Sequence, residues 1–82
     1  MKDRILFLGG ASSQVVAIEC ARKKGIYSIV CDYDTSAPGA EVCDKFYNVS
    51  TLDFESLLSI AQTEHVNGVV AYACLLYTSD AA

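Results

Sequence analysis

Short apolar segments alternate with helix-like segments along this chain, and that alternation restricts the fold more than any other feature. Four segments have the composition of strands, at residues 4–8, 27–31, 45–49 and 68–73. Two segments have helical periodicity, at residues 12–24 and from Asp53 to the Asn67-Gly68 pair. Strands that are apolar on both faces belong in a parallel sheet covered by helices. The sequence therefore predicts an α/β fold, a Rossmann-like open parallel sheet of about four strands.

The order of the strands follows from the handedness of the connections. Right-handed crossovers leave two sheet orders, and we favour 3-2-1-4 because it puts the two main helices on opposite faces. In that order the chain reverses direction between strands 1 and 4. Open α/β sheets bind ligands in the crevice at that point, and "GGASSQ" (residues 9–14) is expected to lie there.

The two helices have recognisable ends. Ser12 or Ser13 is expected to cap the first helix, and Gly25 to supply the left-handed residue after it. Its expected buried face consists of Ala17, Ile18, Cys20 and Ala21. Ser50-x-x-Asp53 opens the second helix, and His65 is expected to balance the dipole at its end. The expected apolar stripe of that helix consists of Phe54, Leu57, Leu58, Ile60 and Ala61.

The Gly9-Gly10 pair allows two interpretations. It either relieves a tight turn between a strand and a helix, or it presents the amides of residues 10–13 to an anionic group at the helix N-terminus. That group could be a phosphate or a carboxylate. The loop lacks the third glycine of a dinucleotide fingerprint, because Gln14 occupies that position, and it lacks the lysine of a P-loop. Asp32 ends the second strand, where a ribose-binding acid would lie.

Length, charge and cysteine spacing exclude several classes of protein. The 82 residues suffice for one small domain, and the net charge of −4 without a basic cluster argues against nucleic acid and membrane as partners. No apolar run reaches a spanning length, and the N-terminus does not read as a signal peptide, so a cytoplasmic protein is expected. The four cysteines are unevenly spaced, which predicts reduced thiols and neither a zinc site nor a redox pair.

Taken together, three stretches resemble the N-terminal domain of ATP-grasp ligases. They are "ILFLGGASSQVVAIECARKKGIYSIVCDYD", "APGAEVCDKFYNV" and "DFESLLSIAQTEHVNGVVAYA", and the resemblance covers roughly residues 3–73. It implies a parent enzyme that uses ATP and Mg²⁺ to activate a carboxylate as an acyl phosphate for attack by an amine or another nucleophile. The resemblance also implies that the glycine turn forms one wall of the acceptor-substrate site.

The resemblance assigns roles to a few residues only. Carried over by position, it implicates Gly9, Gly10, Gln14 and Asp32 in binding a small-molecule substrate, with no catalytic or metal-binding residue in this segment. The residues that hold ATP and Mg²⁺ in this superfamily belong to later domains, so the segment alone is expected to bind neither. The expected partners are the substrate and the remaining domains of the parent chain.

Two other classes of function are compatible with the same pattern of strands and helices, and the C-terminus has an unusual sequence. The chain could instead be a small NAD(P)- or sugar-nucleotide-binding Rossmann domain of an oxidoreductase or epimerase. A receiver-like regulatory module is the third reading, although the paired acids it needs after strand 1 are missing. Residues 1–73 are expected to form the domain. The end "LLYTSDAA" resembles a translated sequencing adapter, so residues 74–82 are expected to be non-native and poorly ordered, or at most to extend strand 4.

Overall fold

The computed structural model describes residues 3–71 and 74–77. Its elements are β1 (Arg4–Leu8), α1 (Ser12–Lys23), β2 (Tyr27–Cys31), α2 (Pro38–Val42), β3 (Lys45–Tyr47), α3 (Phe54–Glu64), β4 (Gly68–Ala71) and β5 (Cys74–Tyr77). The expected α/β alternation is confirmed. Within the described part of the chain, no helix has the length and apolar character needed to cross a membrane.

The sheet has the order β3-β2-β1-β4-β5, and its first four strands are parallel. The predicted order 3-2-1-4 is therefore confirmed. A fifth strand lies outside that prediction, because β5 runs antiparallel beside β4 as an edge strand of its own and does not extend β4. The rest of the expected tail, residues 78–82, lies outside the described residues.

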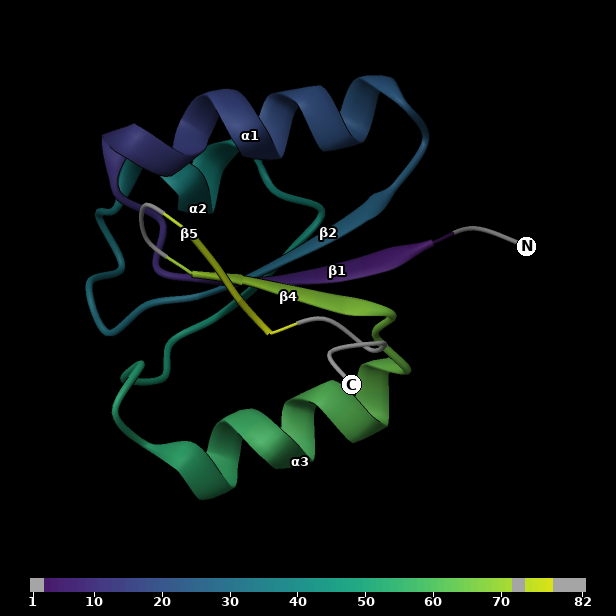
Figure 1. Ribbon diagram of the computed structural model, residues 1–82. Coiled ribbons are helices and arrows are strands. Elements are labelled where there is room, and N and C mark those ends of the chain that lie inside the picture. Colours follow the sequence, from purple (N-terminus) through teal and green to yellow (C-terminus); the bar gives the residue numbers. More distant parts are fainter. Residues whose placement is uncertain (1–2, 72–73, 78–82) are drawn as a thin grey trace.

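Helices cover both faces of the sheet, with α1 and α2 on one side and α3 on the other (Figure 1). Alternate residues of β1 point to opposite faces, so the fold has two hydrophobic clusters. Leu6 belongs to the cluster beneath α3, whereas Phe7 belongs to the cluster beneath α1. These two layers fix the end of β1, which leads directly into the glycine loop.

The buried face of α1 differs from the expected one. Gln14, Ile18 and Ala21 are buried, whereas Ala17 and Cys20 are exposed. The spacing of four and three residues between the buried positions is one helical stripe. The prediction of Ile18 and Ala21 is confirmed, whereas that of Ala17 and Cys20 is wrong. The expected face left out Gln14, which had been considered only as a residue of the glycine loop.

The N-terminus of α1 also corrects a prediction. Ala11 is the N-cap residue and makes no side-chain capping bond, so neither Ser12 nor Ser13 caps the helix. Gly25 has a φ of 80°, as predicted for the left-handed position after the helix.

In α3, two of the five residues of the predicted apolar stripe are buried, Ala61 is partly buried and the other two are exposed. Leu57 and Ile60 are buried, while Phe54 is 74% exposed and Leu58 is 48% exposed. Asp53 is itself the N-cap, because its carboxylate accepts the Ser56 backbone N–H at 3.3 Å. The predicted capping box, which has Ser50 as the cap and Asp53 three residues inside the helix, is therefore wrong. The expected apolar face is thus wider than the surface that the sheet covers.

A polar network fastens the C-terminal end of α3 to the sheet. The guanidinium of Arg4 lies 2.6 Å from the Glu64 carboxylate, which also accepts a hydrogen bond from the Tyr47 hydroxyl. The bond from Tyr47 and the Arg4 charge lower the pKa of Glu64, and the same bond raises the pKa of Tyr47 to about 12. His65 follows in the left-handed conformation, with a φ of 56°.

Candidate glycine-loop site

The glycine loop, residues 9–11, joins β1 to α1 at the place where the sheet order reverses. β1 has β2 on one side and β4 on the other, so the loop lies at the centre of the C-terminal edge of the sheet. Gly9 has a φ of 100°, a conformation that L-residues rarely adopt, and its N–H donates to the Cys31 carbonyl oxygen at 2.8 Å. The predicted position of the loop at the switch point is confirmed.

Gly10 needs to be glycine for a different reason, because another backbone segment packs directly on it. The Gly39 N–H at the start of α2 donates to the Gly10 carbonyl oxygen at 2.6 Å. A Cβ atom at Gly39 would lie 2.7 Å from the Gly10 Cα, and one at Gly10 would lie 3.1 Å from Val30 Cγ1. In the sequence, Pro38-Gly39 indicates a turn and gives no sign of this contact with Gly10.

Asp32 holds the loop from the neighbouring strand. One carboxylate oxygen accepts the Gly10 N–H at 2.8 Å and the other accepts the Asp34 N–H at 2.9 Å. The Gly10 amide, which one of the two interpretations presented to an anionic group, is therefore engaged by this chain's own carboxylate. The loop's shape depends on a residue 22 positions away in the sequence.

Gln14 holds the loop from inside the fold. Its side chain is only 4% exposed, and its amide nitrogen donates to the carbonyl oxygens of Leu8 at 3.2 Å and Gly9 at 3.3 Å. A residue at the third position of a dinucleotide fingerprint is normally glycine, which lets the helix approach the strand. Here the glutamine side chain fills that space and satisfies two loop carbonyl groups.

The surface that remains for a ligand is the first turn of α1. Ala11, Ser12 and Ser13 are exposed, and no acceptor among the described residues pairs with their backbone N–H groups. Unpaired amides at a helix N-terminus carry a partial positive charge and attract anions. The four predicted residues, Gly9, Gly10, Gln14 and Asp32, therefore lie together and fix the shape of the loop. The free hydrogen-bond donors are the backbone N–H groups of residues 11–13.

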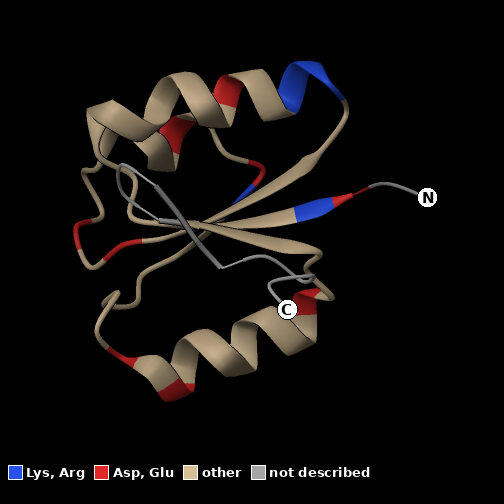
Figure 2. Cartoon of the chain, in the orientation of Figure 1, with Lys and Arg blue, Asp and Glu red and all other residues tan. Residues whose placement is uncertain are grey.

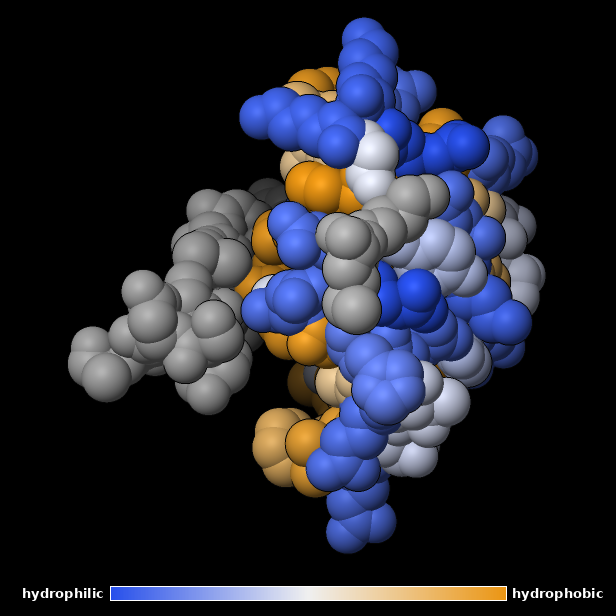
Figure 3. All heavy atoms as spheres, turned by 90° about the vertical axis from the view of Figure 1, so that its right-hand side faces the viewer, coloured by the Kyte–Doolittle hydropathy of each residue, from blue (hydrophilic) through white to orange (hydrophobic). Residues whose placement is uncertain are grey.

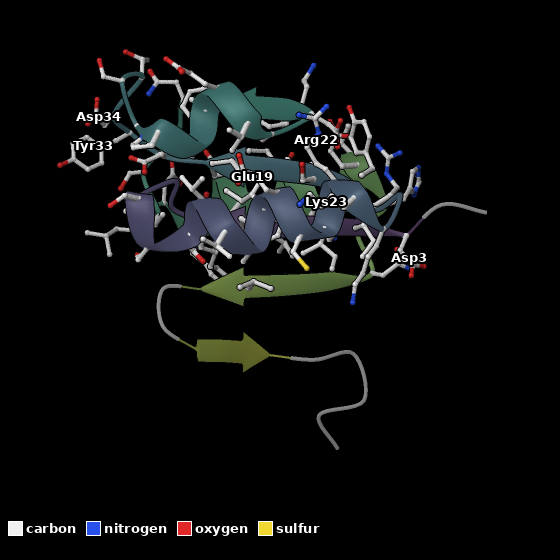
Figure 4. All side chains as sticks on the ribbon, turned by 90° about the horizontal axis from the view of Figure 1, so that it is seen from above. Asp3, Glu19, Arg22, Lys23, Tyr33 and Asp34 are labelled. Carbon is white, nitrogen blue, oxygen red and sulfur yellow. The ribbon has the colours of Figure 1, made fainter. Side chains whose placement is uncertain are left out.

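Charged side chains are distributed unequally between the two ends of the sheet. All Lys and Arg among the described residues are at the beginning of β1 or β3 or at the C-terminal end of α1 (Figure 2). Arg22 and Lys23, with Glu19, lie on α1, far from Tyr33 and Asp34 at the opposite end (Figure 4). The end where the parallel strands begin is mostly hydrophilic (Figure 3). Among residues 3–71 and 74–77, an anion at the glycine loop would therefore meet backbone amides and no cationic side chain.

The other reactive groups of the described residues do not form a second site. Cys20, Cys31 and Cys43 are free thiols, and burial raises the pKa of Cys31 to about 11. Burial also raises the pKa of Cys43, so both thiols stay protonated at neutral pH. Within the described part of the chain, no three His, Cys, Asp or Glu residues are grouped as a metal site requires.

The sheet order, the helices on both faces and the loop at the switch point define an open, Rossmann-like α/β domain. The chain is similar to N5-carboxyaminoimidazole ribonucleotide synthetase from Thermotoga maritima, with a TM-score of 0.75 and 24% identity over 87% of this chain. It spans only 19% of the length of that synthetase. No protein-family model and no curated protein matches the sequence.

Proposed function

We propose that this chain is the N-terminal, substrate-side domain of an ATP-dependent ligase of the ATP-grasp type. The observation that carries the proposal is the similarity of the fold, over 87% of the chain, to a part of a synthetase. The sequence resemblance of residues 3–73 to the N-terminal domains of ATP-grasp ligases points to the same class. Because the chain spans 19% of that synthetase, the parts that bind ATP and Mg²⁺ would lie outside it.

In this proposal the glycine loop forms one wall of the acceptor-substrate site. Gly9, Gly10, Gln14 and Asp32 contribute by fixing the loop, because their groups hold its carbonyl oxygens and amides in place. The free amides of residues 11–13 then bind an anionic group of a small-molecule substrate. Electrostatic attraction to a helix N-terminus suits a phosphate or a carboxylate equally.

The dinucleotide-binding alternative has less support from the geometry. Such a domain uses the acid at the end of the second strand to bind ribose hydroxyl groups. Both oxygens of Asp32 already accept backbone N–H groups, one from Gly10 and one from Asp34. We therefore carry only the ligase proposal forward.

The first test is the gene from which the chain derives. The proposal requires that the codons after residue 73 continue for roughly two hundred residues, the size of one to two further domains. They should encode a glycine-rich flexible loop, a lysine-bearing lid and a late Glu/Asn pair for Mg²⁺. A Tyr-x-x-x-Lys motif in that region would instead identify an epimerase or oxidoreductase and contradict the proposal.

The second test separates a substrate-side role from an ATP-binding role in the longer chain. Ser13→Asp places a carboxylate beside the free amides, which favours the helix by about 0.3–1 kcal/mol but repels an anionic substrate. We expect the KM for the acceptor to rise while the KM for ATP stays unchanged. Ser13→Ala is the control, because it removes the hydroxyl without adding charge. A raised KM for ATP alone would refute the substrate-side assignment.

A further inference from the structure

The peptide group between Gly9 and Gly10 is held from both of its sides. Its carbonyl oxygen accepts a hydrogen bond from the Gln14 side-chain amide at 3.3 Å, and its N–H donates to the Asp32 carboxylate at 2.8 Å. A peptide group is planar and rigid, so these two bonds together fix the rotation of the whole unit. Gln14 is buried in α1, whereas Asp32 follows the end of β2. The orientation of the loop therefore depends on how firmly Asp32 is itself held.

Asp32 lies just beyond the last paired residue of its strand. β2 ends at Cys31, which pairs with Tyr47 at the end of β3. The Asp32 N–H donates to the Tyr47 carbonyl oxygen at 3.2 Å, at the long end of the usual range. The Asp32 carbonyl oxygen accepts from a side chain, the amide of Asn48, at 3.1 Å. Asn48 thus continues the connection between the two strands by one more residue.

The Asn48 side chain holds the turn that carries the Asp32 carboxylate. Its amide nitrogen donates to two consecutive carbonyl oxygens, those of Asp32 at 3.1 Å and Tyr33 at 2.8 Å. A side-chain amide has two N–H donors, so both bonds form at once. The second oxygen of the Asp32 carboxylate accepts the Asp34 N–H at 2.9 Å within the same turn. A shift of this turn would therefore move the carboxylate relative to Gly10.

We propose that Asn48 is a positioning residue for the substrate-binding amides of the glycine loop, acting through Asp32 and Gly10. This inference rests on the proposed function, in which the backbone N–H groups of residues 11–13 bind an anionic group. The Gly10 carbonyl oxygen accepts the Gly39 N–H, and in a trans peptide the N–H points away from the carbonyl oxygen of the same unit. A rotation at Gly10 would therefore turn the first free N–H away from its ligand.

A contribution to stability alone is the competing account of Asn48, whose side chain is exposed. The two accounts differ in the amides that Asn48 protects. The Gly9 N–H donates to the Cys31 carbonyl oxygen of β2, whereas the Gly10 N–H depends on the Asp32 side chain. Lower stability would expose both amides to solvent, but a loss of positioning would expose the Gly10 amide alone.

Amide hydrogen exchange of residues 1–82, followed by NMR, separates the two accounts. Asn48→Asp keeps the shape of the side chain but has no donor, and Asn48→Ala removes the donors without adding charge. In both variants exchange of the Gly10 amide should become at least about fivefold faster, the effect of one lost hydrogen bond, while the Gly9 rate stays within about twofold. Asn67→Asp is the matched control, because Asn67 accepts the Arg4 N–H through its oxygen and aspartate keeps that acceptor.

Three results of the exchange experiment would overturn the positioning role. The first is an unchanged Gly10 rate, and the second is equal acceleration of Gly9 and Gly10. The third is acceleration in Asn48→Asp but not in Asn48→Ala, because the added charge would then be its cause. Equal acceleration in Asn67→Asp would count in the same way, since that variant retains its hydrogen bond.

Titration of the same chain with inorganic phosphate, and separately with acetate, tests the effect on binding. The amide shifts of residues 11–13 report the dissociation constant of the folded molecules, which a change in stability alone leaves unaltered. For an anion that binds, the constant should rise about threefold to tenfold in Asn48→Ala and stay within about twofold in Asn67→Asp. Equal binding by Asn48→Ala and the wild type would refute the positioning role alone. If the wild type bound neither anion, the anion-binding role in the proposed function would fall, and this inference with it.

Discussion

Replacing Gly39 by alanine tests the close backbone contact on which the glycine loop depends. A Cβ atom at this position would lie 2.7 Å from the Gly10 Cα and 2.9 Å from the Gly10 carbonyl oxygen. Both partners are backbone atoms, which cannot rotate away as a side chain can. The start of α2 must therefore move outward, and the hydrogen bond from the Gly39 N–H to the Gly10 carbonyl oxygen must lengthen or break.

The magnitude follows from three contributions. Overpacking at a tight contact costs about 1–3 kcal/mol, and a lost backbone hydrogen bond costs about 1 kcal/mol. In the opposite direction, alanine lowers the conformational entropy of the unfolded chain, which stabilises the fold by about 0.4–1 kcal/mol. The net destabilisation is about 2 kcal/mol, which lowers the Tm of a domain of this size by roughly 8–16 °C.

Gly68→Ala is the matched control for this substitution. A Cβ atom at Gly68 meets nothing within 4 Å, and its φ is not in the left-handed region. Thermal and urea unfolding, followed by circular dichroism, should show a Tm for Gly68→Ala within about 3 °C of the wild-type value. If Gly39→Ala and Gly68→Ala had the same Tm, the packing of α2 against the glycine loop would be refuted.

Three further predictions concern the polar network, the sheet edge and ATP. Because the pKa of Glu64 is lowered in the fold, its stabilisation is present above its ordinary value of 4.5 and is lost as the pH falls through the folded value. When the pH is lowered by about three units, from 6 to 3, the urea midpoint of unfolding should therefore fall less in Glu64→Gln than in the wild type. The pKa of Tyr47 is raised from 10 to about 12, so the stability that this hydroxyl contributes is lost as the pH rises through that range. The free energy of unfolding should therefore fall less steeply with pH in Tyr47→Phe than in the wild type. Equal slopes in the two proteins would contradict the network. Amides of Cys74–Tyr77 should exchange with deuterium faster than those of Gly68–Ala71, because β5 pairs with a strand on one side only; equal protection would argue for a native fifth strand. Calorimetric titration of residues 1–82 with ATP should give no micromolar binding, and measurable micromolar binding would place nucleotide recognition in this domain.

The sequence by itself determined the strand order and the position of the loop. Alternating apolar strands and helices force a parallel sheet, and the right-handed crossover then leaves little freedom in the order of four strands. The left-handed φ of Gly9 came from the structure, whereas Gly25 was readable as a left-handed position because it directly follows a helix. These features depend on local pattern, which is why one sequence suffices to predict them.

Only the tertiary structure decided which groups build the site. Asp32 takes the Gly10 amide across a span of 22 residues, and Gly39 packs on Gly10 from another helix. Gln14 is buried because two loop carbonyl oxygens need donors, so a polar residue occupies the helix face where a hydrophobic stripe was expected. Phe54, in the first turn of α3, remains exposed although it lies on the predicted apolar stripe. Helical periodicity identifies an apolar face, but the size of the neighbouring layer determines how much of that face is buried.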